Sequence, residues 1–143
     1  MLTNKTDITA ETALSLASSA IAHARANSWE ITVAICDSAG NLLAFLRTDT
    51  VVIPAIDFAL DKAFTAASLR TPTGAFGERM ASHPTLSLGV GTRSRLLTWA
   101  GGLPIFSDGV CVGGIGVSGA KDHEDLACAH AALDALGLSA SAS

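Results

Sequence analysis

The sequence predicts an α+β domain in which helices pack on an antiparallel sheet of about five strands. Two pairs of apolar segments carry this prediction, because only a short turn separates the members of each pair. Residues 31–36 and 42–46 form the first pair, and residues 103–106 and 110–117 form the second. Segments with helical spacing lie at the start, in the middle and at the end of the chain, so we expect helices to cover the sheet.

Three segments have the spacing of helices. The first covers residues 10–27, where Thr9 can cap the helix and apolar residues recur every three or four positions. The second runs from Pro54, which suits a first helical turn, to about Arg70. The third covers about 122–136, with Asp122 as N-cap and Gly137 as the stop. A short helix near 74–81 interrupts the passage 71–93, which is rich in Gly, Pro and Thr.

The strands follow from alternation and turn residues. Residues 31–36 alternate as Ile-Thr-Val-Ala-Ile-Cys, and the turn sequence Asp37-Ser38-Ala39-Gly40-Asn41 leads to the second apolar run. Ser107-Asp108-Gly109 is the turn of the second pair. Residues 95–99 supply a further expected strand.

Composition limits the kind of protein this is. We expect residues 1–143 to form one domain. Charged residues make up only 15% of the chain, too few to cover its surface, so we expect a homo-oligomer. The net charge of −4 argues against nucleic acid as a partner. No apolar run approaches the roughly 18 residues that span a bilayer, so we expect no membrane segment. The N-terminus lacks the pattern of a signal peptide, so we expect a cytoplasmic protein.

The stretch 113–119 contains Gly114-x-Gly116-x-x-Gly119, which is formally a dinucleotide-binding fingerprint. That interpretation requires a second parallel strand, and only one helix follows. Asp122, Glu124 and Asp125 also crowd the start of that helix, where a pyrophosphate would bind. We therefore interpret the stretch as a strand whose glycines let another backbone, a helix or a ligand come close.

Five short patterns occur in an order that resembles the GlcG/HbpS family, which includes the C-terminal domain of PduO-type proteins. They are Val33–Asn41, Arg47-Thr48-Asp49, Lys62-Ala63-Phe64-Thr65-Ala66, Gly101-Gly102-Leu103-Pro104-Ile105 and Gly114–Gly119. The resemblance covers Ile8 to Leu136 and implies a profilin-like fold assembled into dimers or larger symmetric oligomers. Some members of the family bind haem, so the resemblance makes haem a possible cofactor.

Arg47 and Lys62 are the most informative charges, because each lies in an otherwise apolar segment. If the fold brings both to one cleft, they would bind an anionic ligand, Arg47 as a bidentate fork and Lys62 as a point charge. The alternative is internal pairing, of Arg47 with Asp49 and of Lys62 with Asp37 or Asp57. Both residues stand in the motifs that carry the resemblance, which favours ligand contact.

Three further elements are candidates. Gly101, Gly102 and Pro104 could turn backbone N–H groups toward a ligand or an oxyanion, or could form only a strained connection. His83 lies in a loop and could act as an acid, a base or a ligand, and Asp37 is a second candidate for moving a proton. His123 and His130 are seven positions apart, about 10 Å along a helix, so they cannot share a metal ion, but either alone could ligate a haem iron. No metal site is expected.

Two functions remain open. The first is a binding module for haem or another planar, carboxylate-bearing molecule, with apolar walls for the ring and Arg47 and Lys62 for the carboxylates. The second is a cofactor-independent lyase or isomerase acting on a small carboxylate or aromatic acid. In that enzyme the amides of Gly101 and Gly102 would stabilise an oxyanion, and His83 or Asp37 would transfer the proton.

Overall fold

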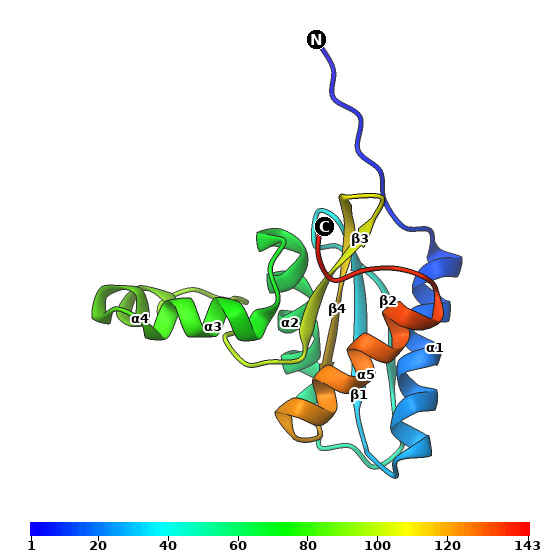
Figure 1. Ribbon diagram of the computed structural model, residues 1–143. Coiled ribbons are helices and arrows are strands. Elements are labelled where there is room, and N and C mark those ends of the chain that lie inside the picture. Colours follow the sequence, from blue (N-terminus) through cyan, green and yellow to red (C-terminus); the bar gives the residue numbers. More distant parts are fainter.

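The computed structural model describes all 143 residues and has one antiparallel sheet of four strands (Figure 1). The sheet order is β2-β1-β4-β3. The strands are β1 (Thr32–Asp37), β2 (Leu42–Arg47), β3 (Gly102–Ser107) and β4 (Val110–Ser118). The α+β class, the antiparallel pairing and both hairpins are confirmed, whereas the expected number of about five strands is wrong by one.

The missing strand is the one expected over 95–99. Arg95 has a φ of 72°, a left-handed conformation that interrupts an extended chain. The hydroxyl of Thr65 on the neighbouring helix donates to the carbonyl of Arg95 and accepts from the N–H of Leu97. These backbone groups therefore bond to a helix side chain instead of a strand.

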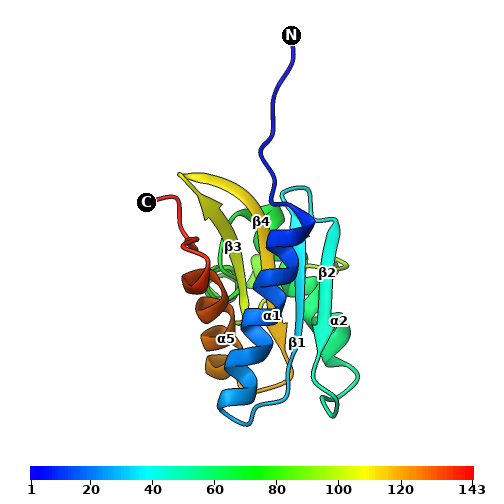
Figure 2. The same cartoon turned by 90° about the vertical axis from the view of Figure 1, so that its right-hand side faces the viewer.

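Helices cover both faces of the sheet. Helices α1 (Ala10–Ala26) and α5 (Asp122–Ala135) lie side by side on one face, as Figure 2 shows, and α2 (Ala55–Leu69) lies on the other. The larger apolar core is on the side of α1 and α5, where Val33 and Ile35 of β1 point. Ala34 and Cys36 point the opposite way, against three alanines of α2. Successive side chains of β1 thus point alternately into two apolar cores, one on each face of the sheet.

The helix ends differ slightly from expectation. Thr9 caps α1 by accepting a hydrogen bond from the N–H of Thr12, and Gly137, with a φ of 68°, follows the end of α5. Asp122, however, is the first residue of α5 and Lys121 is the N-cap, with the Glu124 carboxylate accepting from the Lys121 N–H. Likewise Pro54 is the N-cap of α2, not a residue of its first turn.

Two short helices, α3 (Thr73–Ala81) and α4 (Pro84–Val90), form an arm that projects from the side of the sheet (Figure 1). Helix α3 corresponds to the short helix expected near 74–81. Helix α4 was not expected. The chain returns from the arm to β3 through residues 91–101, and this return places Trp99 and Gly101 beside α2.

Candidate functional site

Lys62 is the centre of the candidate site. It lies on the face of α2 that packs on the sheet, and its side chain is only 1% exposed. Its Nζ donates to the carbonyl oxygen of Val117 at 2.8 Å and to Oδ2 of Asp125 at 3.3 Å. The ion pair with Asp125 joins α2 to α5 across the end of β4. If Lys62 formed an internal pair, the sequence suggested Asp37 or Asp57 as its partner. The partner in the structure is instead Asp125.

Asp125 is as deeply buried as Lys62, with 2% of its side chain exposed. Its second oxygen, Oδ1, accepts a hydrogen bond from the N–H of Ala120 at 3.0 Å. Burial raises the pKa of Asp125 to about 6, against the attraction of the Lys62 ammonium. Burial also lowers the pKa of Lys62, again against the attraction of its partner. Desolvation therefore pushes both members toward their neutral forms.

A small cavity of about 250 Å³ opens beside this ion pair. Lys62, Asp125, Asp122 and Ser118 form its polar part. Its apolar part includes Phe58 and Trp99, whose rings pack edge to face with centroids 4.9 Å apart. The lining thus combines charged and polar side chains with two aromatic rings.

Gly101 lies directly against Lys62. Its φ is 122°, and a β-carbon at this position would lie 2.8 Å from Nζ of Lys62 and 3.1 Å from Cβ of Asp125. The absence of a side chain therefore lets the backbone of Gly101 pack directly against the head of the lysine. Gly102 has no room for a side chain either, because Thr73 and the backbone of Lys62 lie against it.

The N–H of Gly102 donates to Oγ1 of Thr73 at 2.9 Å, so it is already engaged within the protein. Pro104 lies in β3 opposite Gly114 of β4. Because β3 is an edge strand, the missing N–H of Pro104 is compatible with its place in the sheet. Contact of these two residues with a ligand stays a prediction.

Arg47 lies at the end of the edge strand β2, and its guanidinium donates to the carbonyl oxygens of Thr48 and Asp49, both at 3.2 Å. It lines a shallow hollow against α1, with Ser18 and Arg25 among its neighbours, and not the cavity that Lys62 lines. The structure therefore gives Arg47 and Lys62 separate surroundings. Ligand contact by Arg47 stays a prediction.

Asp37 and His83 both organise local backbone. Oδ1 of Asp37 accepts from the N–H groups of Ala39 and Asn41, and Oδ2 accepts from the Asn41 amide, which fixes the β1–β2 turn. His83 is the N-cap of α4, where Nδ1 accepts from the N–H of Thr85 at 3.3 Å and lies 2.8 Å from its hydroxyl. Only Nδ1 is engaged, so Nε2 of His83 is free to meet a ligand.

An apolar groove of about 430 Å³ lies along the arm, and sequence analysis did not anticipate it. Its walls include Phe76 and Met80 of α3 and Leu86 of α4. Arg93 is the one charged residue that lines it. The spacing of Phe76 and Met80, one turn apart on a helix, is the only sequence signal for this groove, and it does not identify the facing helix.

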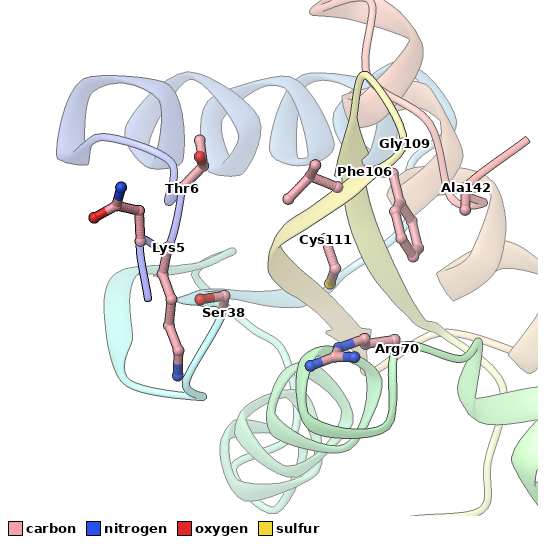
Figure 3. A pocket seen from close by; sticks show the side chains of 10 residues that line it. Lys5, Thr6, Ser38, Arg70, Phe106, Gly109, Cys111 and Ala142 are labelled. Carbon is pink, nitrogen blue, oxygen red and sulfur yellow. The ribbon is translucent and has the colours of Figure 1, made fainter. Parts of the chain in front are cut away.

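The largest hollow, about 650 Å³, lies where the N-terminal segment, the β1–β2 turn and the β3–β4 hairpin meet (Figure 3). Its walls come from segments far apart in the sequence, with Lys5 on one side and Arg70, at the end of α2, on another. Both of these side chains are exposed. The structure shows no group of three or more His, Cys, Asp or Glu side chains placed to hold a metal ion, and none of its helices could cross a membrane.

Comparison with known proteins gives one family. Residues 8–134 match the family model described as haem degrading protein HbpS-like. Protein GlcG of Escherichia coli K12 is 34% identical over 95 residues, which are 66% of this chain and 69% of GlcG. These matches cover most of the segment that carries the five ordered motifs.

Two solved structures resemble the whole fold. The crystal structure of HbpS has a TM-score of 0.86 and 36% identity, covering 95% of this chain and 94% of its own. The crystal structure of the PduOC:haem complex has a TM-score of 0.87, covering 94% of this chain and 99% of its own. At 22% identity, this second likeness shows the fold alone.

Proposed function

Because this chain belongs to the HbpS-like family of haem degrading proteins, we propose that it binds haem or another planar, carboxylate-bearing molecule in the groove between α3 and α4. The observation that carries this proposal is the groove itself. Its volume of about 430 Å³ lies within the range of sites for small organic ligands, and its walls are largely apolar. The cavity beside Lys62, at about 250 Å³, falls below that range.

The residues of the groove fit the chemistry of haem. Phe76, Leu86 and Val90 offer apolar contact to a ring system, and Arg93 offers a fork for a carboxylate. Met80 lines the groove, and His83 adjoins it through Thr85. Thioether sulfur and imidazole nitrogen are both known axial ligands of haem iron. When bound, haem would supply an iron centre, and Met80 or His83 would be the residue that holds it.

We also propose that the protein is a homo-oligomer that pairs through the free edge of β2. This strand ends the sheet, and its first five residues, Leu42–Leu46, carry no charge. Leu42 is 54% exposed and Leu43 is 37% exposed. Uncharged, apolar edge strands are templates for pairing with another strand. Sedimentation of the wild type as a monomer at micromolar concentration would contradict this proposal, and Leu43→Lys should dissociate the oligomer.

An absorbance titration with haemin tests the groove. We expect a saturable change in the Soret band with one haemin bound per chain. Leu86→Asp, which puts a carboxylate against the ring, should weaken binding at least about tenfold because that charge loses its water. Leu88→Asp is the matched control, since Leu88 lies on the same helix, is 74% exposed and does not line the groove. Equal effects of the two substitutions, or no saturable binding, would contradict the proposal.

The spectrum of the bound haem identifies the axial ligand. Met80→Leu keeps the apolar volume and removes only the thioether as a strong ligand, so it should change the spectrum if Met80 binds the iron. His83→Gln keeps a polar side chain at the N-cap of α4 and removes the imidazole. A spectrum unchanged by both substitutions would show that neither residue is the ligand.

A further inference from the structure

The cavity beside Lys62 lies away from the groove of the arm, and the proposed haem site does not use it. A lysine ammonium has three N–H donors, and two of those of Lys62 are taken by Val117 and Asp125. Lys62 itself lines the cavity, together with Ser118 and Asp122. The third donor is therefore left for an acceptor in the cavity, and a buried amine stands in the wall of a space large enough for a small molecule.

The charges around the cavity favour a neutral ligand over a carboxylate. The Asp125 carboxylate already balances the Lys62 ammonium, and Asp122 adds a second negative charge to the lining. A carboxylate entering the cavity would meet net negative charge, at a cost that low dielectric increases. A carbonyl oxygen carries no net charge and can still accept a hydrogen bond from Lys62.

We propose that this cavity takes a small aldehyde with a short apolar body and that Lys62 forms a reversible imine with it. Phe58 and Trp99 provide an aromatic wall for the body. Ser118, whose hydroxyl makes no hydrogen bond within the protein, adds a polar group near the reacting carbonyl. The small volume excludes haem and other large rings.

The reaction balances with the residues present. A proton passes from the Lys62 ammonium to Asp125, and the free amine attacks the carbonyl carbon to form a C–N bond. The amine proton moves to the carbonyl oxygen, which gives a carbinolamine. Asp125 then returns its proton to the hydroxyl, the C–O bond breaks, and water leaves as the C=N bond forms. The product is an iminium cation with the Asp125 carboxylate as its counter-ion, so the buried ion pair is preserved.

The ionisation of the pair suits this chemistry. Burial lowers the pKa of Lys62, which increases the fraction of free amine near neutral pH. Burial raises the pKa of Asp125 to about 6, which makes its carboxyl group able to accept and return a proton. Lysines that form imines are commonly activated by such desolvation.

The chain provides its own controls, because Lys5, Lys62 and Lys121 are its only lysines. Wild-type protein without haem is incubated with butanal at neutral pH and reduced with sodium cyanoborohydride, and each lysine peptide is quantified by mass spectrometry. Lys5 and Lys121 are exposed and so report ordinary amine reactivity. We expect Lys62 to carry at least about tenfold more adduct than either, because burial lowers its pKa and the cavity holds the aldehyde against its amine.

Two variants separate the cavity from the amine. Ala55→Leu fills part of the cavity and should reduce the Lys62 adduct, with Lys5 and Lys121 unchanged. Lys121→Arg removes an exposed lysine and should leave the Lys62 adduct as in the wild type. Lys62 labelling no greater than that of Lys5, or labelling that appears only after urea unfolding, would overturn the proposal. Because haem is absent throughout, failure here and failure of the haem titration are independent results.

Discussion

Gly116 of β4 lies directly beneath Ala59 of α2, so closely that a β-carbon at position 116 would collide with the carbonyl oxygen of Ala59. Gly114, on the same face of the strand, stands in the same relation to Ala63. The glycines of 113–119 therefore allow a helix to approach the sheet, as the interpretation of a glycine-punctuated strand expected. They hold α2, and with it Lys62, at the depth where the ion pair with Asp125 can form.

Gly116→Ala should lower the free energy of unfolding by about 1–3 kcal/mol, because α2 must move outward to relieve the collision. Urea unfolding followed by circular dichroism measures the change. Gly89→Ala is the control, since nothing lies within 4 Å of the added carbon. In helix α4 that alanine should raise stability by up to about 1 kcal/mol. Equal losses in both variants would contradict the packing argument.

Removing one partner of the buried ion pair should be costly. Lys62→Ala leaves Asp125 buried without its cation, and we expect a loss of about 3–5 kcal/mol in the free energy of unfolding. The double variant Lys62→Met with Asp125→Leu removes both charges and should recover most of that loss. Chemical unfolding of the single and double variants gives the coupling. A double variant as unstable as the single one would show that packing, not charge, dominates.

The pH dependence of stability should carry the signature of Asp125. Its pKa is about 6 in the folded protein and 3.8 in the unfolded chain, so the folded state binds this proton more tightly. The stabilisation from that proton is complete below about pH 3.8 and is lost as the pH rises through about 6. Lys62 and Asp122 are the charged groups that act on Asp125.

The comparison that isolates this effect is with Asp125→Asn. We expect the stability of the wild type relative to this variant to fall between pH 4 and pH 7. Groups that do not interact with Asp125 titrate equally in both proteins, so their contributions cancel. Urea unfolding at four or five pH values measures the difference. A difference that rises with pH would mean that Lys62 depresses the pKa of Asp125 and that burial does not dominate.

Asp37→Ala should weaken the β1–β2 turn. The change removes three hydrogen bonds to Ala39 and Asn41, and we expect a loss of about 1–2 kcal/mol because the turn is partly exposed. Thermal unfolding measures the loss, with Asp134→Ala on the exposed side of α5 as the control. A loss no larger than that of Asp134→Ala would contradict this role of Asp37 in the turn.

Local patterns predicted the local structure well. Turn residues such as Gly40 and Asp108 identified both hairpins, and the helical spacing located α1, α2 and α5 within one or two residues of their ends. The prediction of a strand over 95–99 was wrong because backbone groups of this segment bond to Thr65. Thr65 lies 30 positions before Arg95 in the sequence. No pattern within the segment itself contains that information.

The candidate site was predicted only in part for the same reason. Lys62 stood out as a charge in an apolar helix, and Gly101 as a residue near a ligand, and the structure brings the two together. The partner of Lys62 was not identified, because Asp125 is 63 positions away. Asp57, one of the two partners suggested from the sequence, is five positions earlier on the same helix. Because each residue turns a helix by about 100°, the side chain of Asp57 points well away from the face that carries Lys62.

The arm and the central sheet differ in how easily each opens locally. Helices α3 and α4 pack mainly on each other, whereas β1 and β4 are covered on both faces. Amide hydrogens in the arm should therefore exchange with solvent through a small opening that leaves the sheet intact, while those of β1 and β4 should exchange only when the whole protein unfolds. A ligand held between α3 and α4 would slow exchange in the arm alone, so deuterium uptake can locate an occupant of the groove before its identity is known.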